Sequence, residues 1–139
     1  MLNGTYTHNV DDKGRVVIPV KFKKELGLEF IITAGFDGAL MIMSKEEWKV
    51  FVARFDNLPV TKARRLRRYF IGNMQDASTD KQGRMQIPQQ LRIDFGIEEE
   101  VVLVGSGNMV ELWPVDKWEQ ETNNLTSDAI IEEMDELVF

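Results

Sequence analysis

The sequence contains no cysteine and only one histidine among its 139 residues. The absence of cysteine excludes a disulfide framework and any metal site built from thiolates. His8 has no second histidine or cysteine to join it and lies in a stretch rich in β-forming residues, so we expect it on the surface of a strand rather than at a metal. The sequence therefore predicts neither a metal site nor a cofactor.

Long apolar runs and recognisable catalytic groups are also missing. No run is long enough to cross a membrane, and the N-terminal residues lack the charged and apolar regions of a signal peptide, so we expect a cytoplasmic protein. No nucleophile paired with a base and no phosphate-binding loop accompanies the acidic and basic residues. The pair Gly105 and Gly107 is too short for a dinucleotide-binding fingerprint. These absences argue against an enzyme.

The charge of the chain is unevenly distributed. The formal net charge of −6 would by itself disfavour contact with nucleic acid. However, residues 1–75 contain 13 Lys/Arg and 8 Asp/Glu, a net charge of +5, whereas residues 76–139 contain 4 and 15, a net charge of −11. A protein that is acidic overall can therefore still present a basic surface.

One motif occurs twice in the chain. The segment DDKGRVVIP at residues 11–19 returns as DKQGRMQIP at residues 80–88, so both copies read D-x-x-G-R-h-x-I-P with a spacing of 69 positions. The similarity continues beyond the motif, where residues of the first copy match residues of the second as follows: Phe22 with Leu91, Leu26 with Phe95, Gly27 with Gly96, Gly35 with Gly105, and Trp48 with Trp118. The chain is a tandem duplication. Each repeat is too small for a comfortable core of its own, so we expect the two to fold together as a pseudo-dimer.

Each copy of the motif predicts a tight turn that leads into a strand. Asp11 and Asp80 can accept hydrogen bonds from turn amides, and Gly14 and Gly83 can adopt the positive φ that such a turn requires. In the strand that follows, alternate residues should face a core, namely Val16 and Ile18, and Met85 and Ile87 in the second copy.

The residues expected to point outward begin with an arginine in each copy. Arg15 and Arg84 open their strands across the turn from Asp11 and Asp80, which can orient the guanidinium groups without burying them. One such pair would be a structural turn with a surface ion pair, worth only about 0–1 kcal/mol. Two copies, each followed by a strand and a proline, favour a function.

The remaining pattern predicts the same order of strands and helices in both repeats. For the first repeat we expect strands at residues 4–10, 15–18, 28–34 and 39–43, a helix from Pro19 to Leu26, and a second helix capped by Ser44 and Glu47. For the second repeat we expect strands at residues 101–104 and 109–113, a turn at residues 105–108, and a helix that begins at Pro114 and carries Trp118.

A basic segment links the repeats. Within residues 62–70, KARRLRRYF, the apolar residues Ala63, Leu66 and Phe70 recur at helical spacing and can face a core. The exposed side then carries three arginines: Arg64, Arg65 and Arg68. Two interpretations remain open: these arginines pair with the acidic C-terminal half or support an oligomer interface, or they contact DNA directly.

The tail after residue 123 is acidic. Thr126 to Asp128 can cap a last helix, whose apolar stripe lies among acidic residues and consists of Ile130, Met134, Leu137 and Val138. Such a helix could dock on its own chain, dock on a neighbour, or stay mobile.

The two motifs, the repeat and the arginine-rich stretch before the second copy resemble the MraZ family of bacterial transcriptional regulators, over residues 1 to about 120. The resemblance implies a mainly β fold with helices, in which two tandem SpoVT-AbrB-like swapped hairpins form a double-split β-barrel pseudo-dimer. It implies a first repeat at residues 1–56, a basic linking helix at 57–73, a second repeat at 74–122 and an acidic tail at 123–139. The family pattern also has arginines at the positions of Arg64, Arg65 and Arg68. This chain departs from it at Met74 and Asp76, where relatives tend to have a small residue and Glu.

The leading hypothesis is a sequence-specific DNA-binding transcriptional regulator in the nucleoid. Arginine suits bidentate contact with guanine in the major groove, which also admits a two-stranded ribbon. Arg15 and Arg84 would contact bases, oriented by Asp11, Asp80, Gly14 and Gly83, while Lys13, Lys81 and Lys21 would contact phosphates. The resemblance implies ring-shaped homo-oligomers that bind short repeats in double-stranded DNA upstream of their own operon, the division and cell-wall gene cluster. The alternative is an antitoxin-like protein-binding module whose acidic tail grips a partner, although the complete second repeat argues against a simple antitoxin.

Overall fold

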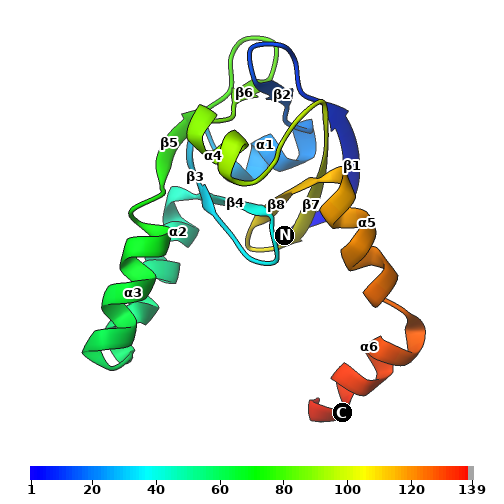
Figure 1. Cartoon of the computed structure of the whole chain (residues 1–139). Coiled ribbons are helices and arrows are strands. Elements are labelled where there is room, and N and C mark those ends of the chain that lie inside the picture. The colour runs from blue at the N-terminus through cyan, green and yellow to red at the C-terminus, as the bar shows by residue number, and fades with distance from the viewer. Residues whose placement is uncertain (138–139) are drawn as a thin grey trace.

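The computed structural model describes residues 1–137 (Figure 1), so the predicted stripe residue Val138 lies outside the described residues. The first repeat contains β1 (Leu2–Asn9), β2 (Arg15–Val17), α1 (Val20–Leu26), β3 (Glu29–Ala34), β4 (Leu40–Ser44), α2 (Lys45–Ala53) and the 3-10 helix η1 (Arg54–Asn57). The linking helix is α3 (Val60–Phe70). The second repeat contains β5 (Gln75–Ser78), β6 (Arg84–Gln86), α4 (Gln89–Asp94), β7 (Glu100–Gly107), β8 (Val110–Pro114), α5 (Val115–Asn124), α6 (Ser127–Glu133) and the 3-10 helix η2 (Met134–Glu136).

The two repeats exchange strands within one sheet. The order of the six strands is β1-β7-β8-β4-β3-β5, and all neighbours are antiparallel. Strand β1 of the first repeat therefore pairs with the β7–β8 hairpin of the second, and β5 of the second repeat pairs with the β3–β4 hairpin of the first. This exchange confirms the tandem swapped-hairpin pseudo-dimer.

A separate two-stranded ribbon joins β2 to β6, again one strand from each repeat. The strands expected at residues 4–10 and 15–18, on either side of the first tight turn, pair with each other only through a single bridge between Val10 and Val16, because β2 takes its main partner from the second repeat. The expected barrel is also not closed among the described residues, since β1 and β5 remain the two edges of the large sheet.

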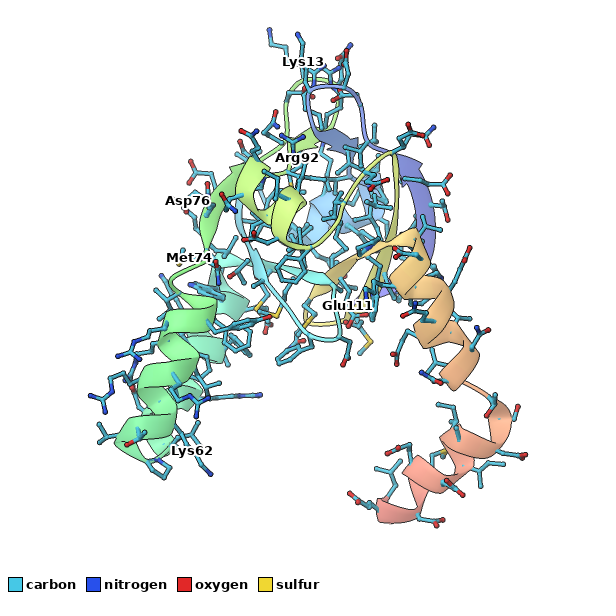
Figure 2. The ribbon with its side chains drawn as sticks, in the orientation of Figure 1. Lys13, Lys62, Met74, Asp76, Arg92 and Glu111 are labelled. Atoms are coloured by element: carbon cyan, nitrogen blue, oxygen red, sulfur yellow. The ribbon has the colours of Figure 1, made fainter. Side chains whose placement is uncertain are left out.

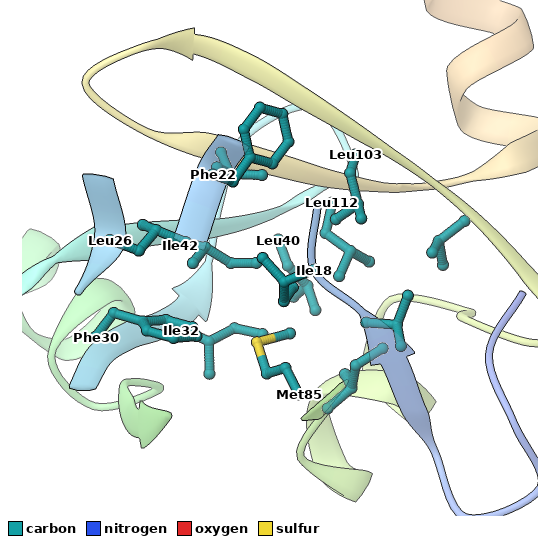
Figure 3. Close-up of a cluster of buried hydrophobic side chains, with 14 of the residues drawn as sticks. Ile18, Phe22, Leu26, Phe30, Ile32, Leu40, Ile42, Met85, Leu103 and Leu112 are labelled. Atoms are coloured by element: carbon teal, nitrogen blue, oxygen red, sulfur yellow. The ribbon is translucent and has the colours of Figure 1, made fainter. Parts of the chain in front are cut away.

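The core contains side chains from both repeats (Figure 3). The inward residues of the ribbon, Val16 and Met85, are 1% and 0% exposed, which confirms the predicted alternation. They pack with residues of α1 and of the large sheet, including Phe22, Phe30 and Leu103. Full burial of side chains of this size stabilises a fold by about 1.5–3 kcal/mol each. Separation of the two repeats would therefore expose the apolar core that they share.

Several predicted boundaries differ from the structure by one or two residues, and the largest difference is at the end of one strand. The turn expected at residues 105–108 instead continues strand β7 to Gly107, because β1 pairs with β7 along its whole length, from Leu2 opposite Gly107 to Asn9 opposite Glu100. A Cβ atom at Gly105 would lie 2.4 Å from the backbone nitrogen of Asn3, so glycine permits the close approach of the two strands.

Two helical arms extend from the sheet on opposite sides (Figure 1). In one arm α2, η1 and α3 fold back on each other around Trp48, Phe55 and Phe70. In the other arm α5 leaves the sheet, where Trp118 packs against Trp113 with ring centroids 5.6 Å apart, and α6 continues outward. Along residues 1–137 no helix combines the length and the apolar character needed to cross a bilayer.

Candidate nucleic-acid interface

Two turns of nearly identical geometry lie together at the end of the molecule opposite the helical arms (Figure 1). In the first, Oδ1 of Asp11 accepts hydrogen bonds from the backbone N–H groups of Lys13 (3.0 Å) and Arg15 (2.8 Å). The backbone N–H of Gly14 donates to the carbonyl of Asp11 at 2.9 Å, with φ of Gly14 at 79°. The aspartate thus shapes the turn, and the glycine supplies the left-handed backbone that the turn needs.

The second turn repeats this geometry. Oδ1 of Asp80 accepts hydrogen bonds from the backbone N–H groups of Gln82 and Arg84, both at 2.9 Å. The N–H of Gly83 donates to the carbonyl of Asp80 at 3.0 Å, and φ of Gly83 is 78°. The expectation that the aspartates and glycines form tight turns is confirmed in both copies.

Each aspartate uses its second oxygen to hold the arginine of its own motif. Oδ2 of Asp11 lies 2.7 Å from Nε of Arg15, and Oδ2 of Asp80 lies 2.8 Å from Nε of Arg84. Among the described residues, neither arginine donates a hydrogen bond from its terminal nitrogens Nη1 and Nη2. Each guanidinium is therefore held along one edge while its outer edge stays available to a ligand.

The same contacts lower the pKa of both carboxyl groups. For Asp11 the largest cause is the hydrogen bond from the backbone N–H of Arg15. The next cause that lowers the pKa is the hydrogen bond from the Arg15 side chain. The pKa of Asp80 is lowered by the corresponding bonds from Arg84. Both carboxylates are consequently ionised at neutral pH, which the bond to arginine requires.

The ribbon places the two arginines on one outward surface. Arg15 lies opposite Gln86, and Val17 lies opposite Arg84, while Val16 and Met85 between them face the core. Gln86 also donates a hydrogen bond from Nε2 to the carbonyl of Lys13 at 2.7 Å. The outward surface of a ribbon formed by both repeats thus carries two arginines, a glutamine and a valine.

Each turn is locked by the other repeat. The N–H of Ile18 donates to the carbonyl of Gly83, and the N–H of Ile87 donates to the carbonyl of Gly14, both at 2.9 Å. The turns therefore keep a fixed separation, which the recognition of a repetitive ligand such as duplex DNA requires.

Sequence reasoning missed two cations beside the turns. Arg92 of α4 reaches the first turn: its Nε donates to the carbonyl of Ile87 at 3.1 Å, and a Cβ atom at Gly14 would lie 2.3 Å from its Cζ (Figure 2). In the second turn, a Cβ atom at Gly83 would lie 3.9 Å from Nζ of Lys23 in α1. Lys23 and Arg92 are 69 positions apart, as the two motifs are, and this shared repeat position was the signal that could have identified them.

Lys21 is not brought to the turns. Its Nζ donates a hydrogen bond to Oδ1 of Asn3, near the start of β1. A strand rises about 3.3 Å per residue, so Asn3 lies on the order of 20 Å from Asn9 at the turn end of β1. Lys13 and Lys81, in contrast, lie within the turns and are exposed (Figure 2 labels Lys13).

The three arginines of α3 singled out from the sequence lie in the arm, away from the turns (Figure 1). Ala63 and Phe70 are buried as expected, and Arg64, Arg65 and Arg68 are exposed. The expected pairing with the acidic half of the same chain does not occur within residues 1–137, where the one ion pair from this helix joins Arg67 to Asp56 at 2.5 Å. The arm that carries α6 extends on the other side of the sheet.

Comparison with known proteins gives the family. A family model described as "MraZ protein, putative antitoxin-like" matches residues 1–68 and again residues 70–138. The chain belongs to the MraZ family. Proteins named "Transcriptional regulator MraZ" are 43% identical in Thermoanaerobacter sp. (strain X514), 41% in Lachnoclostridium phytofermentans and 40% in Clostridium tetani. These alignments cover 98–99% of this chain and 96–99% of the relatives.

The family match agrees with the duplicated architecture. The MraZ model matches the chain once per half, and each match contains one aspartate–arginine turn and one strand of the ribbon. The paired arginines are therefore a feature that arises only when the two family units of this MraZ chain fold together.

Proposed function

We propose that this chain is a sequence-specific DNA-binding transcriptional regulator that acts in the bacterial cytoplasm at the nucleoid, without enzymatic activity. The observation that carries the proposal is the pair of aspartate-held arginines on a ribbon built from both repeats. A two-stranded ribbon fits the major groove, and the outer edge of an oriented arginine can donate two hydrogen bonds to O6 and N7 of guanine.

In this proposal Arg15 and Arg84 contact bases, with Asp11, Asp80, Gly14 and Gly83 holding them in place. Lys13 and Lys81 in the turns contact phosphates, joined by Lys23 and Arg92 from the neighbouring helices. Lys21 stays outside this group because its contact with Asn3 directs it elsewhere. We assign the repeats to residues 1–56 and 74–122, the linking segment to 57–73 and the acidic tail to 123–139.

A single ribbon offers few contacts, so tight binding requires several copies on repeated half-sites. We therefore propose a ring-like homo-oligomer that binds short repeats in the DNA upstream of its own operon. The relatives' name, transcriptional regulator, supports control of transcription.

The test is binding of the purified protein to the DNA upstream of its own gene, measured by fluorescence anisotropy with a scrambled duplex as competitor. We expect Arg15→Ala and Arg84→Ala each to weaken specific binding by roughly tenfold or more, since one bidentate arginine–guanine contact contributes about 1–3 kcal/mol. The matched control is Arg68→Ala in the distant arm, which should bind as the wild type does. Equal affinity of all four proteins at the same salt concentration would refute the assignment.

The alternative is an antitoxin-like protein-binding module, which the wording of the family description and the exposed apolar tail both support. It predicts that the protein is purified with a basic partner at fixed stoichiometry and retains no specific DNA. The anisotropy experiment therefore separates the two functions.

A further inference from the structure

The last helix occupies the same place in the second repeat as the linking helix does in the first, but along residues 127–133 it buries no side chain. α3 follows α2, and α6 follows α5, the equivalent of α2 at a spacing of 70 residues. α3 folds back and buries Ala63 and Phe70 at 3% exposure. Along α6 and η2, by contrast, the apolar side chains stay open: Ile130 40%, Ile131 62%, Met134 39% and Leu137 58% exposed.

The first arm carries a groove that suits such a helix. A hollow of about 450 Å³ on α3 is lined by Leu58, Lys62, Arg65, Leu66 and Tyr69. The hydroxyl of Tyr69 donates to the carbonyl of Gly35 at 2.5 Å, which fixes the ring that forms one wall. Leu58 and Tyr69 are 39% and 41% exposed, and the charged groups in the lining are both cations. The groove therefore fits an apolar stripe flanked by acids.

The two surfaces also match in charge. The sequence from Val60 to Phe70 has five basic residues and no acidic one, whereas the sequence from Ser127 to Leu137 has five acidic residues and no basic one. At about 100° per residue along α6 and about 120° per residue along η2, Glu133 and Glu136 lie beside the apolar stripe formed by Ile130 and Met134, and Glu132 and Asp135 lie on its opposite side. On α3, Lys62 and Arg65 line the groove, and Arg64 and Arg68 lie on the other side of the helix.

We propose that α6 of one copy docks in the α3 groove of a second copy, with its apolar stripe against Leu58 and Leu66 and its flanking carboxylates against Lys62 and Arg65. The occupant is a second copy because the two arms of one chain extend from opposite sides of the sheet (Figure 1). The packing of Trp118 on Trp113 also holds α5, and so the start of the tail, on the far side from the groove.

This contact joins two different surfaces, so every copy bound through its tail still offers a free groove. Such head-to-tail contacts close into rings or extend as filaments. The inference rests on the proposed oligomer and names the surfaces that hold it together. It also directs Lys62 and Arg65 of α3 to a neighbouring protein chain instead of DNA.

The test uses charge reversals in the full-length chain, with molecular mass measured by light scattering after size-exclusion chromatography. We expect Lys62→Glu with Arg65→Glu to produce monomers, and Glu133→Lys with Glu136→Lys to do the same. The matched controls, Arg64→Glu with Arg68→Glu and Glu132→Lys with Asp135→Lys, change charge by the same amounts on the opposite helix faces and should assemble normally. Circular dichroism verifies that all variants are folded.

Mixing the two disrupted variants gives the decisive result. In an assembly in which the two variants alternate, the charge-reversed groove of one variant meets the charge-reversed tail of the other. The unchanged groove of the second variant meets the unchanged tail of the first. The 1:1 mixture should therefore regain at least the wild-type mass per particle. Failure of the mixture to assemble, or monomers from the control variants as readily as from the groove variants, would overturn the docking contact. A wild-type monomer, or a basic protein found on the tail instead, would overturn it as well. Binding of DNA by each variant at the turns is measured separately, so the proposed regulator function can stand if the docking contact fails.

Discussion

Each motif aspartate divides its two oxygens between two tasks. Oδ1 accepts the backbone N–H groups that shape the turn, and Oδ2 accepts the arginine side chain. The aspartate that orients the arginine is thus also the residue that shapes the turn, which explains why aspartate and arginine occur together in both copies of the motif.

This division predicts how the aspartates titrate. The pKa of Asp11 is lowered from 3.8 chiefly by the backbone N–H of residue 15 and secondarily by the Arg15 side chain. Because the folded pKa is lowered, the stabilisation by this carboxylate is present above the ordinary pKa and is lost as pH falls through the folded value. In Arg15→Ala we expect the pKa of Asp11, followed by carboxyl ¹³C NMR, to rise part of the way to 3.8. Asp80 in the same protein is the internal control, and a full return of Asp11 to its ordinary value would contradict the backbone contribution.

At the scale of turns and strands, the sequence determined what is local. The aspartate–amide bonds, the glycine φ and the alternation of Val16 and Met85 involve residues within a few positions of each other, and the structure confirms them. The pairing of β2 with β6 was harder to predict from the residues, because both copies have the same pattern and each strand had two suitable partners. The exchange of strands between the repeats was instead predicted from the resemblance to the MraZ family.

The site was only partly predictable for the same reason. Gln86, Lys23 and Arg92 acquire their places through contacts across the repeats, such as the bond from Gln86 to the carbonyl of Lys13. Lys21 is as basic as Lys23 and nearer to the motif in sequence, but the direction of α1 places it beside Asn3. Which of two lysines reaches a turn depends on the helix axis, and no local pattern contains that information.

The glycines of the two turns should respond differently to the same substitution. Gly83→Ala meets almost open space and suffers mainly from the positive φ, which costs about 1–2 kcal/mol. Gly14→Ala suffers the same strain and must also displace the Arg92 guanidinium, 2.3 Å from the new Cβ. We expect thermal denaturation to show a fall in Tm of several degrees for Gly83→Ala and a larger fall for Gly14→Ala. An equal fall for both would mean that Arg92 moves aside freely.

At the scale of the whole molecule, the acidic tail lies apart from the turns. The turns carry Lys13, Lys81, Lys23 and Arg92, while the acidic tail extends from the arm at the far end. This arrangement keeps the charge of the acidic tail away from the proposed DNA surface and helps an acidic protein to attract phosphates locally.

DNA affinity should therefore fall steeply with salt despite the acidic composition. Four phosphate contacts per chain predict a slope of log affinity against log salt of about −3.6, since each contributes about −0.9. Lys23→Ala and Arg92→Ala should each make the slope shallower by about one unit, measured by anisotropy over a salt series. Lys21→Ala is the matched control and should leave the slope unchanged. If Lys21→Ala changed the slope as much as Lys23→Ala, the distinction between the two lysines would be wrong.

The outward surface of the ribbon differs from a symmetric pair at one position: Val17 of the first repeat corresponds to Gln86 of the second. Two identical hairpins would be related by a two-fold axis and would suit a palindrome, which has no direction along the DNA. The two hairpins of this chain are not identical, so they lack that two-fold symmetry. In the proposed complex, a glutamine and a valine would fall on opposite flanks of the two arginines, so the protein would have a forward and a reverse orientation along the duplex. Copies joined head to tail would share that orientation. Such an assembly would therefore recognise half-sites that all face the same way along the DNA, and not half-sites that face each other.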